Sequence, residues 1–202
     1  MNVRSGVTRD IEWAIAERAL DDAPESGDTA VVLQTPRGVL LVVMDGLGHG
    51  PAAAVASAEA VATIEADSTG PVEDILARCH RAITRTRGAV ISLAAIEDGV
   101  VRWVGVGNVE GLIVRRAPAV RERLLLWGGV VGHNLPTLRA SSIPWGDGDL
   151  LVFATDGLRP DFADAIAPGM APEMAVVSAF VKSYGKRDDA LILAARWHRP
   201  QA

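Results

Sequence analysis

The sequence predicts an α+β fold built as an antiparallel β-sandwich with helices outside it. Many short apolar or alternating segments are separated by turn residues, which is typical of strands joined by hairpins. The helical segments come in clusters instead of alternating with the strands, which argues against a doubly wound parallel sheet. The 202 residues, 49% of them hydrophobic, suit one packed domain spanning 1–202.

The first half of the chain is expected to hold three strands. Alternating or apolar patterns predict them over 11–16, 30–33 and 38–44, with a polar loop over 21–28 and a hairpin turn at 35–38. The run 38–44 is apolar throughout, so we expect it at the centre of a sheet, covered on both faces.

Two helices should follow the glycine loop 46–50. Pro51 suits the first turn of a helix, and an alanine-rich segment continues to Ala66, where small side chains allow close packing on a sheet. A second, amphipathic helix is predicted over 71–87 and ended by Gly88.

The second half of the chain indicates consecutive hairpins, of which Glu97-Asp98-Gly99 is the strongest turn. One further helix is expected. The predicted strands are 89–96, 100–105, 111–114, 123–127, 138–143, 150–154 and 190–196, and the helix is 172–183.

Composition excludes several classes of protein. A net charge of −5 argues against binding to nucleic acid or to an acidic membrane surface. The single cysteine, Cys79, allows no disulfide within the chain and fits a reducing cytoplasm. Residues 1–10 hold no apolar signal region, and no apolar run is long enough to span a bilayer. We therefore expect a cytoplasmic protein, and a monomer.

Aspartates recur beside apolar runs, and this is the pattern that bears on chemistry. Carboxylates gathered at strand ends repel each other, and hard divalent cations with oxygen ligands stabilise such clusters. No comparable set of His and Cys exists, so magnesium or manganese is favoured over zinc. The segments are Ser26-Gly27-Asp28, Val42 to Gly50 with Asp45, Val152 to Leu158 with Asp156, and Lys186 to Leu193 with Asp188 and Asp189.

Each segment alone has a simpler interpretation. Asp45 before a glycine loop fits a tight strand-to-helix turn, and Gly-Asp or Asp-Gly pairs are common in turns. A dinucleotide fingerprint would need its third glycine where Pro51 stands, and a Walker loop would need Gly-Lys-Ser/Thr, which is absent.

In their order and spacing these segments resemble the type 2C protein phosphatases, the metal-dependent PPM family, and in particular its bacterial SpoIIE-like branch. The compact length is similar to the RsbX-type phosphatases that act on stressosome proteins. The resemblance implies two packed antiparallel sheets flanked by helices on both sides, a four-layer αββα arrangement. The matching residues are Gly27-Asp28, Asp45-Gly46-Leu47-Gly48-His49-Gly50, Gly107-Asn108, Thr155-Asp156-Gly157-Leu158 and Asp188-Asp189-Ala190.

The resemblance also implies a site for two Mn²⁺ or Mg²⁺ ions whose bound water is the nucleophile, with no catalytic side chain. Asp45 would bridge the ions, and the Gly46 carbonyl would bind one of them. Asp28 would serve that same ion, while Asp156 and Asp188 would hold the other.

Three further residues are candidates for supporting these ligands. Asp189 matches a family position that supports the ligands without binding a metal. From the residues themselves, we expect His49 to structure the glycine loop, while Asn108 fits either an ordering role through its side-chain amide or a turn. Leu47 stands where the eukaryotic enzymes have a histidine proposed as general acid. The surroundings of Asp28 are also less acidic than the family pattern, which implies partial occupancy of the second metal site.

The first hypothesis is therefore a metal-dependent phosphoserine/phosphothreonine protein phosphatase acting on phosphorylated STAS-domain proteins of a stressosome or partner-switching pathway. One alternative is a phosphatase-like module that binds a phosphoprotein without turnover; it would need a damaged metal position. Another is a nucleotide-binding protein that uses the loop 46–50. Arg85 and Arg87 fit either contact with a phosphoprotein or a solvated helix end.

Overall fold

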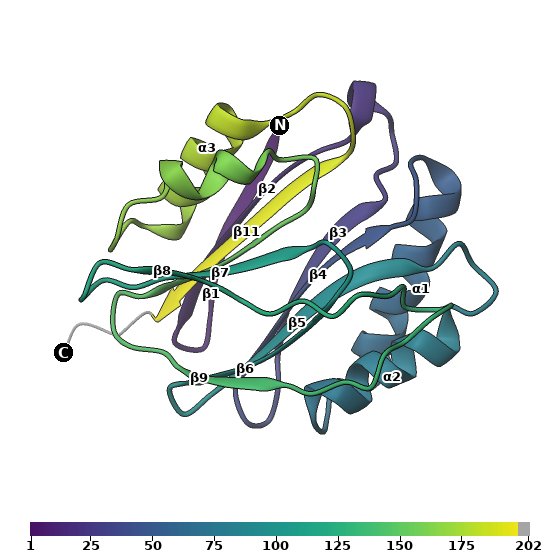
Figure 1. Ribbon diagram of the computed structural model, residues 1–202, viewed down its shortest axis with the longest axis horizontal. Coiled ribbons are helices and arrows are strands. Elements are labelled where there is room, and N and C mark those ends of the chain that lie inside the picture. Colours follow the sequence, from purple (N-terminus) through teal and green to yellow (C-terminus); the bar gives the residue numbers. More distant parts are fainter. Residues whose placement is uncertain (198–202) are drawn as a thin grey trace.

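The computed structural model describes residues 1–197, which form a sandwich of two antiparallel sheets (Figure 1). The first sheet has six strands in the order β1 (Asn2–Thr8), β2 (Ile11–Arg18), β11 (Ala190–Trp197), β10 (Leu150–Ala154), β7 (Glu110–Val114) and β8 (Arg121–Arg123). The second has five strands in the order β3 (Asp28–Gln34), β4 (Val39–Gly46), β5 (Ala89–Glu97), β6 (Val100–Val106) and β9 (Ser141–Pro144).

Helices cover the outer face of each sheet, as predicted (Figure 1). The helices α1 (Pro51–Ala66) and α2 (Val72–Ala82) lie on the second sheet. The helix α3 (Pro172–Ser183) and the 3₁₀ turn η2 (Pro160–Ala165) lie on the first. A short 3₁₀ turn, η1 (Leu20–Asp22), stands in the loop between β2 and β3. None of the helices in residues 1–197 has the length and apolar character needed to cross a membrane.

Three apolar layers hold the sandwich together, and β4 contributes to two of them. Leu41 and Val43 face the layer between the sheets, beside Trp103 and Phe153. The alternate residues of β4, Leu40, Val42 and Met44, pack under α1 and α2. The expectation that this strand is central and covered on both faces is confirmed, because it lies between β3 and β5. A third layer lies under α3.

Several predicted boundaries were wrong. The helix predicted over 71–87 ends at Ala82, because the Thr86 amide and hydroxyl both bond to the Ile83 carbonyl and turn the chain away. The strand predicted over 123–127 is displaced to Arg121–Arg123, while Trp127 bonds instead to β6. The strand predicted over 138–143 covers only Ser141–Pro144.

The strand β1 and the turn η2 were not predicted. β1 is an edge strand with no fully buried residue, so its sequence carries little apolar alternation. Its side chains help to join the sheets: the Arg4 guanidinium donates a hydrogen bond to the Ala30 carbonyl of β3 at 2.9 Å.

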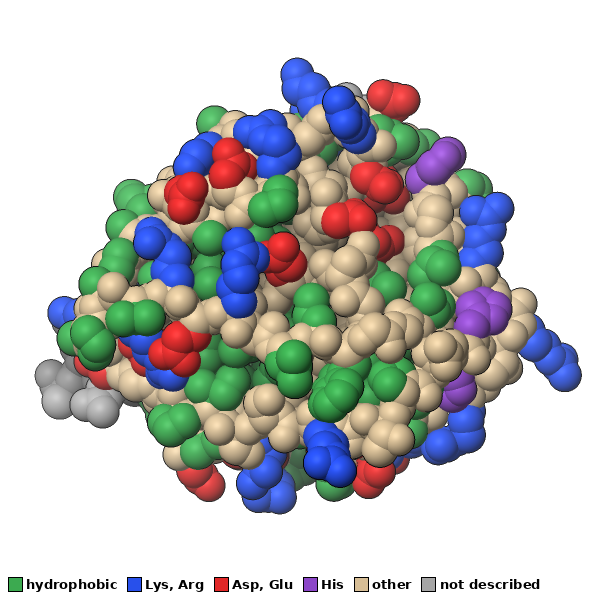
Figure 2. All heavy atoms as spheres, viewed as in Figure 1, with side chains coloured by type: hydrophobic (Ala, Val, Ile, Leu, Met, Phe, Trp, Pro, Cys, Tyr) green, Lys and Arg blue, Asp and Glu red, His purple; other side chains and the backbone are tan. Residues whose placement is uncertain are grey.

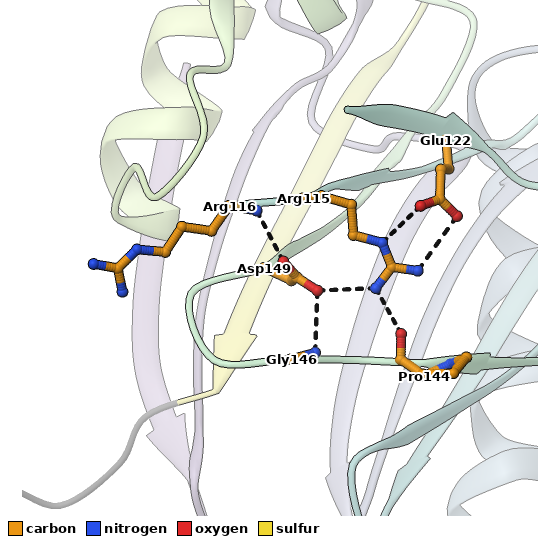
Figure 3. A network of polar contacts seen from close by, with 6 residues as sticks. All are labelled: Arg115, Arg116, Glu122, Pro144, Gly146 and Asp149. Carbon is orange, nitrogen blue, oxygen red and sulfur yellow. Dashed lines mark hydrogen bonds and ion pairs between the residues drawn. The ribbon is translucent and has the colours of Figure 1, made fainter. Parts of the chain in front are cut away.

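A polar network closes the end of the sandwich where β10 begins (Figure 3). The Asp149 carboxylate accepts hydrogen bonds from the Arg115 guanidinium and from the Arg116 and Gly146 amides, at 2.9 to 3.0 Å. Arg115 also bonds to both carboxylate oxygens of Glu122. The network therefore ties the β7–β8 hairpin to the turn between β9 and β10.

Candidate metal centre

The four aspartates predicted as metal ligands lie at one end of the sandwich, on or beside strands from both sheets. Asp28 begins β3 and is the direct cross-strand partner of Asp45 in β4. Asp156 follows β10, and Asp188 precedes the neighbouring antiparallel strand β11. Figure 2 shows acidic side chains gathered in the upper right of the face drawn, at this end of the molecule.

Thr155 joins the two pairs of aspartates. Its hydroxyl donates a hydrogen bond of 2.7 Å to Asp28 Oδ2 across the sandwich, and accepts one of 2.9 Å from the Leu191 amide of β11. The start of β3 is thus held against the ends of β10 and β11. The sequence analysis included Thr155 in a motif but predicted no role for it. The available signal was its position directly after an apolar strand and before Asp156.

The carboxylates interact strongly with one another. Burial first, and then Asp156, Asp188 and Asp189, raise the pKa of Asp45 to about 7. Burial and the neighbouring Asp45 raise the pKa of Asp28 well above its usual value, although the hydrogen bond from Thr155 lowers it. Burial removes water that would stabilise the charged carboxylates, and the neighbouring negative charges destabilise them further. These two effects explain both pKa shifts.

Asp156 belongs to the same cluster. Burial and then Asp188 raise its pKa. None of the groups that act on Asp28, Asp45 or Asp156 is a Lys or Arg side chain, among the residues described. The donor set therefore consists of carboxylates without a protein counter-charge, which fits hard divalent cations.

The carboxylates of the cluster lie near one another without enclosing a single ion position. Within residues 1–197, no three His, Cys, Asp or Glu side chains are drawn tightly enough together to enclose one ion. The pKa shifts nevertheless couple Asp45 to carboxylates on both sheets, so the charges share one region. We keep the assignment of individual metal ligands as a prediction.

Gly46 stands where α1 crosses the end of β4. A Cβ there would lie 2.2 Å from the Ala53 carbonyl oxygen, so only glycine lets the helix pack so closely. Its carbonyl oxygen faces Gly27, where a Cβ would lie 3.1 Å from it. Two glycines thus leave room around the backbone carbonyl predicted to bind a metal.

Ser57 of α1 also holds this backbone in place. Its buried hydroxyl donates a hydrogen bond of 2.5 Å to the Gly27 carbonyl, directly before Asp28. Sequence reasoning missed it. The signal was a polar residue on the face of α1 that otherwise carries buried Ala53, Ala56 and Ala60.

Asp189 acts on the backbone before Asp28. Its buried carboxylate accepts a hydrogen bond from the Leu20 amide and another from the Gly27 amide, each of 2.7 Å. It therefore fixes both ends of the loop that leads to Asp28. This geometry supports the prediction that Asp189 positions the metal ligands without binding a metal itself.

The remaining predicted residues lie at the rim of the centre. The Asn108 side-chain amide donates a hydrogen bond of 2.7 Å to Asp156 Oδ2, which supports its predicted ordering role. His49 lies exposed on the glycine loop, and in the described part of the chain no hydrogen bond or ion pair joins it to the carboxylates. Its role in shaping the loop stays a prediction.

A sandwich of two antiparallel sheets covered by helices, with aspartates from both sheets at one end, defines a phosphatase-like fold of type 2C. The model of the stage II sporulation protein E (SpoIIE) family matches residues 35–198. The chain belongs to this family.

Similar proteins come from sequence and from structure. The phosphoserine phosphatase RsbX of Bacillus subtilis strain 168 is 26% identical over 166 residues, which cover 81% of this chain and 83% of RsbX. A crystal structure of RsbX in complex with magnesium has a TM-score of 0.87 at 21% identity, covering 97% of this chain and 100% of the other. This second likeness shows the fold.

A third similar protein comes from structural work on the bacterial stressosome, described as a modular system adapted to control secondary messenger signalling. Its TM-score is 0.83 at 29% identity, covering 92% of this chain and 99% of the other. Together the comparisons bear out the prediction of a metal-dependent serine/threonine protein phosphatase of the SpoIIE-like branch, and they do not favour the binding module without turnover.

Proposed function

We propose that this chain hydrolyses phosphoserine or phosphothreonine in a protein substrate, with two Mg²⁺ or Mn²⁺ ions held by Asp28, Asp45, the Gly46 carbonyl, Asp156 and Asp188. The observation that carries the proposal is a set of aspartates brought together from both sheets, in which burial and neighbouring carboxylates raise the pKa values of Asp28, Asp45 and Asp156 without a protein counter-charge. Bound there, the cations would lower the pKa of a water molecule and offset charge on the phosphoryl oxygens.

The residues of the chain orient this chemistry. In this proposal Asp45, the cross-strand partner of Asp28, would serve both ions, while Asn108 would orient Asp156 from the rim through its hydrogen bond. Thr155 and Asp189 fix the carboxylate of Asp28 and the backbone before it.

A covalent phosphocysteine route is disfavoured. Cys79, the single cysteine, is buried between α2 and α1 with its thiol against the Ala60 carbonyl. Burial raises the pKa of this thiol to about 12, so almost none is thiolate at neutral pH. Hydrolysis by an activated water fits the site better.

We infer that the substrates are phosphorylated STAS-domain proteins of a stressosome or partner-switching pathway, and that dephosphorylation resets stress signalling. The support is the likeness to RsbX and to the protein from the stressosome study. We further propose that the chain works as a monomer in the cytoplasm, a compartment to which its single cysteine is suited.

The test is phosphate release from a phosphoserine peptide and from a phosphorylated STAS-domain protein, with Mn²⁺, with Mg²⁺ and with EDTA. Turnover that requires a divalent cation, and that is faster on the STAS-domain protein, is the expected result. Calorimetric titration of the metal-free protein with Mn²⁺ counts the ions. Release that persists in EDTA, or no release with either cation, would overturn the proposal.

A further inference from the structure

Arg87 lies against the glycine loop 46–50, which begins with the proposed metal ligand Gly46. The Leu47 amide donates a hydrogen bond of 3.0 Å to the Gly88 carbonyl, which places the end of the α2–β5 connection beside the glycine loop. A Cβ on Gly48 would stand 3.0 Å from Arg87 Nη1. The guanidinium therefore rests on the backbone three residues beyond Asp45.

The backbone on both sides of Arg87 is fixed. The Thr86 hydroxyl donates a hydrogen bond to the Ile83 carbonyl at 2.8 Å and accepts one from the Gly88 amide at 3.0 Å. Gly88 has a φ of 80°, and a Cβ there would lie 2.7 Å from His133 Cδ2. A constrained turn thus presents the arginine, which lowers the entropy lost when its guanidinium binds a ligand.

The Arg87 side chain is exposed, and its guanidinium is available for hydrogen bonding. Within residues 1–197, no carboxylate or carbonyl accepts a hydrogen bond from it. Other arginines are engaged: Arg78 bonds to two carbonyls, Arg115 to two carboxylates, and Arg121 to two carbonyls near η2. A cation without a partner beside the glycine loop is available to an anionic ligand.

Charge balance at the centre calls for such a cation. The four proposed ligand carboxylates carry about as much negative charge as two divalent cations carry positive charge. A phosphomonoester dianion would then approach a nearly neutral site. The planar fork of an arginine matches phosphoryl oxygens in a paired geometry, and it is weakly hydrated.

We propose that Arg87 binds the non-bridging oxygens of the substrate's phosphoryl group, and so sets the affinity of the centre for phosphomonoesters. This role rests on the proposed phosphatase function. It gives the α2–β5 turn a part in substrate binding that none of the metal-ligand motifs supplies.

The test compares Arg87→Ala and Arg87→Lys with a matched control, Arg85→Ala, which removes an exposed arginine two residues away. Each protein is assayed with a small aryl phosphate and with a phosphoserine peptide. Binding of inorganic phosphate to the manganese-loaded protein is measured by calorimetry. Arg87→Ala should raise KM for both substrates and weaken phosphate binding by about 10-fold or more. Arg87→Lys should recover part of this, and Arg85→Ala should stay within about twofold.

Each contrary outcome has a distinct meaning. Unchanged KM and phosphate affinity in Arg87→Ala would overturn the assignment, as would a larger effect from Arg187→Ala, which removes the exposed arginine beside Asp188. A loss confined to the peptide would show contact with the flanking protein instead of the phosphoryl group. If the wild-type protein shows no metal-dependent turnover, the proposed function fails, while phosphate calorimetry still decides the role of Arg87.

Discussion

Two buried aspartates at opposite ends of the sandwich have opposite surroundings. Asp28 is 7% exposed and Asp149 is 6% exposed, yet the pKa of the first is raised and that of the second lowered. Burial acts to raise both values. At Asp149 the Arg116 amide, the Arg115 guanidinium and the Gly146 amide outweigh burial, whereas at Asp28 the neighbouring Asp45 adds to it.

The contrast extends along a single strand. Asp149 directly precedes β10 and Asp156 lies two residues beyond its end, so six residues separate a carboxylate paired with an arginine from a cluster without a protein counter-charge. A buried charge with fixed partners stabilises the fold, while unpaired charges at a strand end are typical of a functional site. Figure 3 shows the end of the sandwich near Asp149, where this carboxylate is bonded to an arginine and to backbone amides.

The largest expected effect comes from Asp156→Asn. Loss of one carboxylate from the cluster should lower phosphatase activity by more than about 100-fold, since partners one shell further out already cost about 10- to 100-fold. The metal-free protein should be as stable as the wild type or more stable, because one like charge is gone. Phosphate release and thermal unfolding in EDTA measure the two effects, and full activity would contradict the role assigned to this end.

Asp149→Ala should lower stability and leave activity unchanged, which is the reverse of the effect expected from Asp156→Asn. It leaves Arg115 with one carboxylate partner and removes the acceptor of two backbone amides, so we expect a loss of about 2–3 kcal/mol in the free energy of unfolding. Activity per folded molecule should remain. Urea unfolding monitored by circular dichroism gives the first quantity, and an unchanged midpoint would show that the network adds no stability.

Thr155→Val tests the link between the two sheets. Without the hydroxyl, Asp28 loses a hydrogen bond of 2.7 Å, and affinity for Mn²⁺ should fall by about 10-fold. Thr155→Ser keeps the hydroxyl and is the matched control. Calorimetric titration with Mn²⁺ reads the affinity directly, and equal values for the valine and serine variants would exclude a positioning role.

The two ends should also respond differently to pH. In EDTA, stability should fall as the pH rises from about 4 to about 7, because Asp45 keeps its proton in the folded state up to about pH 7, whereas the unfolded chain releases it near 3.8. The lowered pKa of Asp149 contributes stability that is lost only as the pH falls below its unfolded value. Thermal melts across this range, with Asp45→Asn as the comparison, check the sign: the variant should show a flatter profile.

The smallest effect is expected from Asn108→Ala. Its amide makes one exposed hydrogen bond to Asp156, so its removal should lower kcat/KM by about three- to tenfold. Asn108→Asp, which places a negative charge beside Asp156, should be worse than alanine. Steady-state kinetics at saturating Mn²⁺ distinguish the two variants, and equal activities would show that Asn108 does not orient the carboxylate.

The sequence predicted the fold wherever a segment carried its own periodicity. The boundaries of α1, α3 and β10 were correct because a proline start or a continuous apolar run marks each of them. β1 was missed because its apolar face is mostly exposed, and β8 was misplaced because its three residues are all exposed. Edge strands owe their structure to their neighbours more than to their own pattern.

The candidate centre likewise combines residues that the local sequence pattern predicts with contacts that depend on neighbouring strands. The aspartates were found because each ends or begins an apolar run. The contacts of Thr155, Ser57 and Asp189 depend on which strands become neighbours, and the local sequence does not specify that pairing.

The bonds from Asp189 to the Leu20 and Gly27 amides span almost the whole chain, and β11 stands in the middle of its sheet, between β2 and β10. The last of the described strands to be synthesised, β11, is therefore an interior one. A growing polypeptide holds neither a complete first sheet nor an anchored Asp28 until that strand is inserted. Such a topology delays formation of the centre until β11 has been synthesised, and it makes loss of β11 equivalent to loss of the whole centre.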